Sequence, residues 1–181
     1  MSPFADTVMV VRELIDRPGT SRQLSRSMPA PADLSDDIVR IGEEVRLSGV
    51  LESVVDGVLV RGTVEASARL ACVRCLAEHD DVVSADVIEL YSRPDWHDDE
   101  VIEPGYEIID DTINLDTLLR DALAAATPSH PLCRPDCAGL CPTCGADLNV
   151  APCDGHPERF DPRWAALAEL DVPDVRRQIR K

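Results

Sequence analysis

Alternating apolar and polar residues dominate the first half of the chain. Between residues 44 and 91, apolar side chains recur at every second position, as in the run 45–51, and this period is typical of strands that bury one face. Asp56-Gly57 separates two such runs and favours a hairpin turn. Further apolar runs cover 64–70 and 82–90. The pattern predicts an antiparallel β meander of at least four strands, forming a partial barrel.

A helical period replaces the alternation near residue 114. Apolar residues at 115, 118, 119, 122, 123 and 126 share one helix face. Asn114 is a suitable N-cap, and Pro128 should end the helix. The apolar face of this helix should pack on the sheet. We therefore expect an α+β fold with one main helix, followed by a cysteine-rich segment stapled by zinc.

The other segments show neither period over any length. Residues 1–18 hold a short apolar patch, and residues 19–37 are rich in Ser, Arg and Pro and predict a connector. A short helix should begin at Asp161-Pro162, before a basic tail at 176–181. We divide the chain into an N-terminal segment with connector (1–43), a β-rich core with an acidic excursion and packing helix (44–127), and a cysteine-rich segment with short helix and basic tail (128–181).

Charge narrows the choice of partners. The net charge is −16, and residues 76–111 contain 13 acidic residues against Arg93 alone, a balance of −12 that leaves −4 for the rest. Such a surface repels phosphate backbones and favours a basic protein over direct RNA contact. Arg17, Arg22 and Arg26 form only a weak basic spot, which we interpret as solvated. No run is long enough to span a membrane, and no signal peptide precedes the first acidic residues, so we expect a cytoplasmic protein.

Cysteines carry the clearest chemical signal. Five of the seven lie between 133 and 153. Cys141 and Cys144 flank Pro-Thr and precede Gly145, which is the pattern of a zinc knuckle whose turn can use a positive φ. Cys72 and Cys75 form a similar pair at the end of a predicted strand. With His156, three residues after Cys153, the chain has eight ligands, enough for two closed tetrahedral zinc sites.

The grouping of these ligands is open. We prefer the partition in which the predicted helix delivers two cysteines to the upstream pair, giving Cys72, Cys75, Cys133 and Cys137 on one ion and Cys141, Cys144, Cys153 and His156 on the other. A rival partition places the four cysteines of 133–144 on one ion and leaves Cys72, Cys75, Cys153 and His156 for the second. A third possibility is a single zinc ion with spare thiols.

Other chemistries fit less well. Disulfides need an oxidising compartment. A redox-active pair at Cys72 and Cys75 would normally open a helix in a βαβ unit, whereas this pair follows a strand. Catalytic zinc keeps an open position and uses more His or carboxylate ligands. We interpret Asp98-Asp99, His79 and His97 as solvated side chains, and we assign no catalytic residue.

Three stretches together resemble a known family. They are Cys72-Val-Arg-Cys75-Leu after a β-rich half, Ile113-Asn-Leu-Asp before a leucine helix, and PLCRPDCAGLCPTCGADLN at 131–149. These stretches, with DPRWAAL at 161–167, are similar to the YceD-like family of large ribosomal RNA subunit accumulation proteins. Where that family commonly has Cys-x-Cys, this chain has Cys153-Asp-Gly, and His156 replaces the missing ligand.

The resemblance implies a role in the accumulation or maturation of 23S rRNA, in a family without established enzymes. It also implies a partner among large-subunit ribosomal proteins or precursor rRNA, since the family's gene often lies beside that of a small basic ribosomal protein. We therefore expect a non-catalytic factor with one or two structural zinc ions and no small-molecule substrate. The alternative is a thiol-based redox enzyme or zinc-switch sensor using Cys72 and Cys75. A zinc-ribbon transcription module is a third hypothesis, weakened by the lack of a basic surface.

Overall fold

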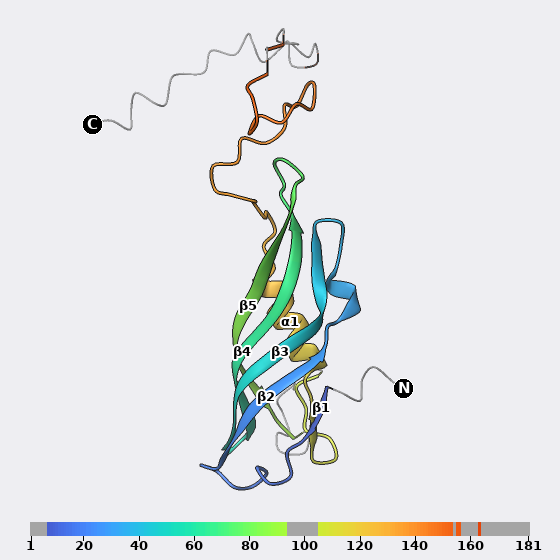
Figure 1. Cartoon of the computed structure of the whole chain (residues 1–181). Helices are drawn as coiled ribbons and strands as arrows, with labels where there is room; N and C mark the ends of the chain where they lie inside the picture. Colours follow the sequence, from blue (N-terminus) through green and yellow to red (C-terminus); the bar gives the residue numbers. More distant parts are fainter. Residues whose placement is uncertain (1–6, 94–104, 154, 157–162, 164–181) are drawn as a thin grey trace, which may run out of the picture. The chain divides into compact units, whose positions relative to one another are not determined.

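A computed structural model describes residues 7–93, 105–153, 155–156 and 163. The chain divides into two compact units, Met1–Gly139 and Leu140–Lys181, which we call the first and second units. All strands and helices named below belong to the first unit (Figure 1). Within the described residues, no helix is both long and apolar enough to cross a membrane.

The main feature of the first unit is a four-stranded antiparallel sheet (Figure 1). Its strands are β2 (Ser21–Pro29), β3 (Val39–Val54), β4 (Gly57–Ala71) and β5 (Glu78–Tyr91), in the order β2-β3-β4-β5. The predicted antiparallel meander is therefore confirmed in part: residues 44–91 contribute three strands, β3, β4 and β5, rather than at least four, and the fourth strand is β2. The sheet is open rather than closed into a barrel, because β2 and β5 are its two edges in the described part of the chain.

Two smaller elements accompany this sheet. Strands β1 (Val8–Val10) and β6 (Thr112–Asn114) form an antiparallel pair. A 3-10 turn, η2, covers Ala32–Leu34, and α1 covers Asp116–Ala126. Because α1 is the only α-helix among the described residues, the fold is mostly sheet, with less helix than the expected α+β class implies.

The core lies between one face of the sheet and α1. Alternate residues of the strands point to this face, and Leu47, Leu51 and Val64 are fully buried there. Helix α1 contacts β5 and β4 and contributes Leu118, Leu119, Ala122 and Leu123. In Figure 1 the helix lies behind these strands. The apolar period of 2 in the strands and that of 3.6 in the helix each place apolar side chains on one face, and the two faces pack together in one buried layer.

Two local features lie at the ends of these elements. The Oδ1 atom of Asn114 accepts a hydrogen bond from the Asp116 amide at 3.0 Å just before α1. The N-cap residue itself is Leu115, one position after the predicted Asn114. The β3–β4 hairpin turns at Val55-Asp56, just before Gly57. At Gly57 φ is +151°, and a Cβ atom would lie 2.0 Å from the Tyr91 carbonyl oxygen, so this position requires glycine.

Strand β2 corrects the prediction for residues 19–37. Residues 21–29 pair with β3 over their whole length instead of forming a connector. Arg22 and Arg26 are also not a solvated basic spot, because their Nη1 atoms donate to the carbonyl oxygens of Val10 and Val8 at 3.0 and 3.3 Å. These two side chains hold β1 beside β2, a structural role.

Three further predictions have different outcomes. His79 is half-buried on β5, and its Nδ1 atom is buried without a hydrogen-bond partner in the described part of the chain, so its assignment as a solvated side chain is wrong. Most of the acidic excursion (94–104), including His97 and Asp98-Asp99, lies outside the described residues. So do nearly all of the C-terminal helix predicted from Asp161 and all of the basic tail.

Truncating the core of α1 should destabilise the first unit strongly. Leu119 is fully buried, so we expect Leu119→Ala to lower the free energy of unfolding by about 2–5 kcal/mol. Leu90→Ala removes the same atoms from a residue that is 38% exposed, and it should cost under about 1 kcal/mol. Urea denaturation followed by circular dichroism measures both. Equal losses in the two variants would contradict the packing described here.

Candidate metal centres

The first cysteine pair lies in the reversal between β4 and β5. The amide of Leu76 donates to the Cys72 carbonyl oxygen at 2.8 Å, and the Cys72 amide donates to the Ala77 carbonyl oxygen at 2.9 Å. These two bonds close a tight turn that carries Cys72 and Cys75. The turn requires a positive φ at its fifth residue, and Leu76 adopts φ +62° there.

The second pair repeats this backbone in the second unit. The Gly145 amide donates to the Cys141 carbonyl oxygen at 2.9 Å, and the Cys141 amide donates to the Ala146 carbonyl oxygen at 2.8 Å. Gly145 takes the positive φ, +74°, as its sequence pattern predicts. Two segments about 70 residues apart in sequence thus form the same knuckle, which can point two sulfur atoms at one ion.

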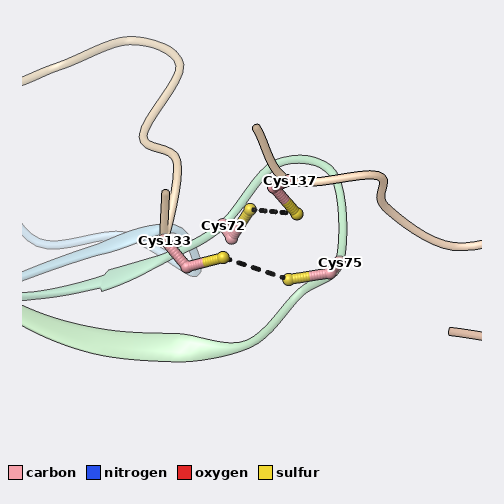
Figure 2. Close-up of side chains that lie close together, drawn as sticks. All are labelled: Cys72, Cys75, Cys133 and Cys137. Atoms are coloured by element: carbon pink, nitrogen blue, oxygen red, sulfur yellow. Dashed lines mark hydrogen bonds between the residues drawn. The ribbon is translucent and has the colours of Figure 1, made fainter. Parts of the chain in front are cut away.

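Four cysteines of the first unit converge on one point. Cys72 and Cys75 come from the β4–β5 turn, and Cys133 and Cys137 come from the segment after α1 (Figure 2). All four sulfur atoms lie within 4.8 Å of one another. We call these residues the first ligand group. Cys72 and Cys137 are buried, with exposures of 0% and 2%.

Sulfur–sulfur distances fit a tetrahedral metal site. The Sγ atoms of Cys72 and Cys137 are 3.8 Å apart, and those of Cys75 and Cys133 are 3.6 Å apart. A tetrahedral ion with metal–sulfur bonds of 2.3 Å requires its sulfur atoms to be about 3.8 Å apart. Disulfide bonds are far shorter, about 2.05 Å, and all seven cysteines are free. The group could therefore hold a metal ion.

One backbone and one side-chain hydrogen bond hold the segment after α1 against the knuckle. The Val73 amide donates to the Pro131 carbonyl oxygen at 3.0 Å, and Arg74 Nη1 donates to the Cys137 carbonyl oxygen at 2.8 Å. Gly139, at φ +76°, allows the chain to pass close by, because a Cβ atom there would lie 2.9 Å from the Arg74 carbonyl oxygen. The site is thus positioned by the fold as well as by its sulfur atoms.

The thiols of this group have opposed acidities. Burial raises the pKa of Cys72, but hydrogen bonds from the backbone amides of Cys133, Cys75 and Arg74 outweigh it and lower the pKa to about 6. Burial, together with the neighbouring thiols of Cys75, Cys137 and Cys72, raises the pKa of Cys133 to about 12. The Cys72 thiol therefore ionises readily, whereas the Cys133 thiol does not. A bound divalent cation would stabilise all of the thiolates and so favour their ionisation.

The second ligand group consists of Cys141, Cys144, Cys153 and His156. One ligand atom from each residue lies within 4.8 Å of the others. Cys141 is buried, whereas Cys144 and His156 are exposed. Hydrogen bonds from the amides of Cys144 and Thr143 lower the pKa of Cys141 to about 6. The Gly155 amide approaches the Cys153 sulfur at 3.4 Å, so backbone donors again face the sulfur atoms.

The second unit has no apolar core in its described part. Every residue of the hydrophobic core belongs to the first unit. Within the described residues of 140–156, Cys141 alone is buried. Apolar packing among these described residues therefore contributes little to holding the segment in one conformation, and a metal ion bound by its four ligands is an interaction that could do so.

The structure brings the predicted ligands together in the preferred partition. All seven cysteines and His156 fall into these two groups, each of which could hold a metal ion, and the assignment of the ligands to two ions stays a prediction. Two supporting residues, Arg74 and Gly139, were not indicated by the cysteine spacing. The positive φ of Leu76 was also missed, although aligning CVRCL with CPTCG places Leu76 at the glycine position.

Comparisons with known proteins agree with this description. Residues 60–171 match the model of the family described as large ribosomal RNA subunit accumulation protein YceD. The uncharacterized protein Rv2926c of Mycobacterium tuberculosis is 39% identical over 162 residues, covering 87% of this chain and 78% of its own length. The uncharacterized protein ML1660 of Mycobacterium leprae is 37% identical over 177 residues, covering 95% and 81%. No solved structure matches. The chain therefore belongs to the YceD family of large ribosomal RNA subunit accumulation proteins.

Proposed function

We propose that this protein is a non-catalytic cytoplasmic factor in large ribosomal subunit biogenesis, which supports the accumulation or maturation of 23S rRNA and is stapled by two zinc ions. The family supports the ribosomal role. The observation that carries the rest is the pair of complete four-ligand groups. A tetrahedral ion with four protein ligands has no open position for a substrate or a reactive water, so its role is structural.

The donor atoms favour zinc over other metals. The first group offers four thiolates, and the second offers three thiolates and an imidazole. Hard ions such as Mg²⁺ and Ca²⁺ prefer oxygen ligands, whereas zinc accepts sulfur and nitrogen in tetrahedral geometry. Binding would give net charges of −2 and −1 at the two sites, so the loaded chain would carry a charge of about −19.

The sulfur geometry does not favour the redox alternative. In the first group, Cys72 faces Cys137 and Cys75 faces Cys133 at 3.8 and 3.6 Å, so each sulfur of the knuckle has a partner in the other segment. A redox pair would instead act as Cys72 with Cys75, without the other two thiols. We infer that the first zinc ion fastens the segment after α1 to the β4–β5 turn.

Charge favours a basic protein as the direct partner. The strongly acidic chain repels a phosphate backbone but attracts the basic surface of a ribosomal protein. We propose that this protein influences large-subunit rRNA through such a partner, with no small-molecule substrate and no membrane contact. The complex should weaken as salt increases, because exposed charges are screened.

Zinc content tests the two-site proposal directly. Native mass spectrometry with elemental analysis should give two zinc ions per chain, since all eight ligands are used. Cys133→Ser should remove one ion from the first group, and Cys153→Ser should remove one ion from the second. Ser129→Ala, at an exposed site near Cys133, should keep both. A chain that is isolated folded and without metal would refute the proposal.

Metal removal should affect the two units differently. After treatment with a strong chelator, amide NMR signals of 140–156 should move to random-coil positions, because the described residues of this segment form no apolar core. Signals of β3 and β4 should remain dispersed, since these strands pack around α1. Added Zn²⁺ should restore the lost signals and Mg²⁺ should not. Unchanged signals for 140–156 would show that metal does not hold the second unit.

Loss of the gene tests the ribosomal role. In a deletion strain, the ratio of large-subunit to small-subunit rRNA should fall, and the wild-type gene should restore it. A gene carrying both Cys133→Ser and Cys153→Ser should restore it poorly, whereas Ser129→Ala should restore it fully, with protein levels compared by immunoblot. An unchanged rRNA ratio in the deletion strain would contradict the proposed function.

A further inference from the structure

Strand β5 leaves one edge of the main sheet available for pairing. It pairs with β4 without interruption from Glu78 to Tyr91. On its other side, no strand of the described residues pairs with it over this length. We call this side the free edge of β5. In Figure 1, β5 is the outermost strand of the sheet on the side opposite β2.

Hydrogen bonds show which backbone groups face the free edge. The Val82 amide donates to the Oδ1 atom of Asp81 at 2.8 Å, so this N–H is directed away from β4. Backbone direction alternates along a strand, and the amides of residues 84, 86, 88 and 90 therefore point the same way. Ser92, just beyond β5, also directs its backbone groups to this side. Its amide donates to the Tyr106 carbonyl oxygen at 3.1 Å, and its carbonyl accepts from the Ile108 amide at 2.9 Å, in a parallel bridge.

That bridge shows that the edge accepts an extended segment. Residues 106–108 occupy only its end at Ser92. The strand before it has no Pro, Gly, Lys or Arg and no bulge against β4. Of the features that prevent pairing of edge strands, it has only charged side chains, and all of these are acidic. The β3–β4 pairing, in contrast, shifts register between Ile41 and Val45.

Side chains along β5 combine exposed apolar groups with acids. Val82 and Ile88 are 61% and 64% exposed on the face of the sheet opposite the core. The acids of the strand are Glu78, Asp80, Asp81, Asp86 and Glu89. Glu78 and Asp80 form exposed ion pairs with Arg40 on β3 and Arg69 on β4, and five acids against these two arginines still leave negative charge along β5. A pairing strand would gain backbone hydrogen bonds, cover apolar surface and meet negative charge.

We propose that the free edge of β5 binds an extended basic segment of a partner protein as an added fifth strand. The proposal deepens the proposed function and rests on it for the idea of a basic protein partner. Charge complementarity selects this occupant, because a second copy of β5 would place acid against acid. RNA would meet the same repulsion.

A proline on the free edge gives the sharpest test. Ser84 is exposed and its amide faces away from β4, so Ser84→Pro should block an added strand without removing a β4–β5 hydrogen bond. Ser84→Ala is the matched control. The probe is a nine-residue peptide of alternating Arg and Val, acetylated and amidated at its ends, and labelled for fluorescence anisotropy. Zinc-loaded full-length protein should bind it, and Ser84→Pro should weaken binding at least about tenfold.

A second measurement leaves the protein unchanged, in case Ser84→Pro alters its thermal unfolding. Two versions of the peptide are methylated on the backbone nitrogens of either its odd or its even residues. One version should bind about as well as the parent and the other about tenfold more weakly, because only one set of amides pairs with β5. A peptide with Glu in place of Arg should not bind, and binding of the Arg peptide should fall with added salt.

Three results would overturn the proposal. They are peptide affinity that Ser84→Pro and both methylated peptides leave unchanged, equal binding of the Glu peptide, and a dimer in solution that Ser84→Pro dissociates. Because these measurements use purified protein, they are independent of the rRNA ratio in a deletion strain. Failure of the proposed ribosomal role and failure of strand addition can therefore be told apart.

Discussion

The first ligand group places four sulfur atoms where four thiolates could not remain together without a cation. Two sulfur–sulfur distances, 3.8 and 3.6 Å, match the edge of a tetrahedral metal–thiolate site. Backbone amides lower the pKa of Cys72, whereas burial and the neighbouring thiols raise the pKa of Cys133, so the four thiols do not all ionise together. This constraint explains why the segment after α1 returns to the β4–β5 turn. A bound divalent cation would offset the repulsion between the thiolates and coordinate all four sulfur atoms.

The two ligand groups share a knuckle but differ in what surrounds it. The first is attached to a sheet with a continuous apolar core, so the unit around it has stability of its own. The second lies in a segment whose described part buries only Cys141. One ion would therefore fasten a folded unit, and the other would supply most of the order of its segment. The same knuckle, with an ion bound, would therefore contribute a larger share of the folding free energy in the second unit than in the first.

The ligands and the main helix could be predicted from sequence because their signals are local. Two cysteines three positions apart specify a turn, and the leucines of α1 specify a face. Strand β2 could not be recognised in this way, since its inward positions alternate between apolar Leu24 and Met28 and the cationic Arg22 and Arg26. Those arginines are tolerated there because β1 offers carbonyl oxygens, a long-range contact that no local pattern reveals. The open sheet was missed for a related reason, because strand alternation specifies pairing but not closure.

Leu76 shows how strongly the geometry of the turn dominates local preference. The second knuckle places glycine in the left-handed region, whereas the first places a leucine there, with its side chain 67% exposed. This conformation costs a non-glycine residue roughly 1–2 kcal/mol. Two backbone hydrogen bonds and the Arg74 contact to Cys137 accompany the turn, and together with a bound ion they would outweigh that cost. The conformation is retained because all four sulfur atoms can converge only if the chain reverses within these residues.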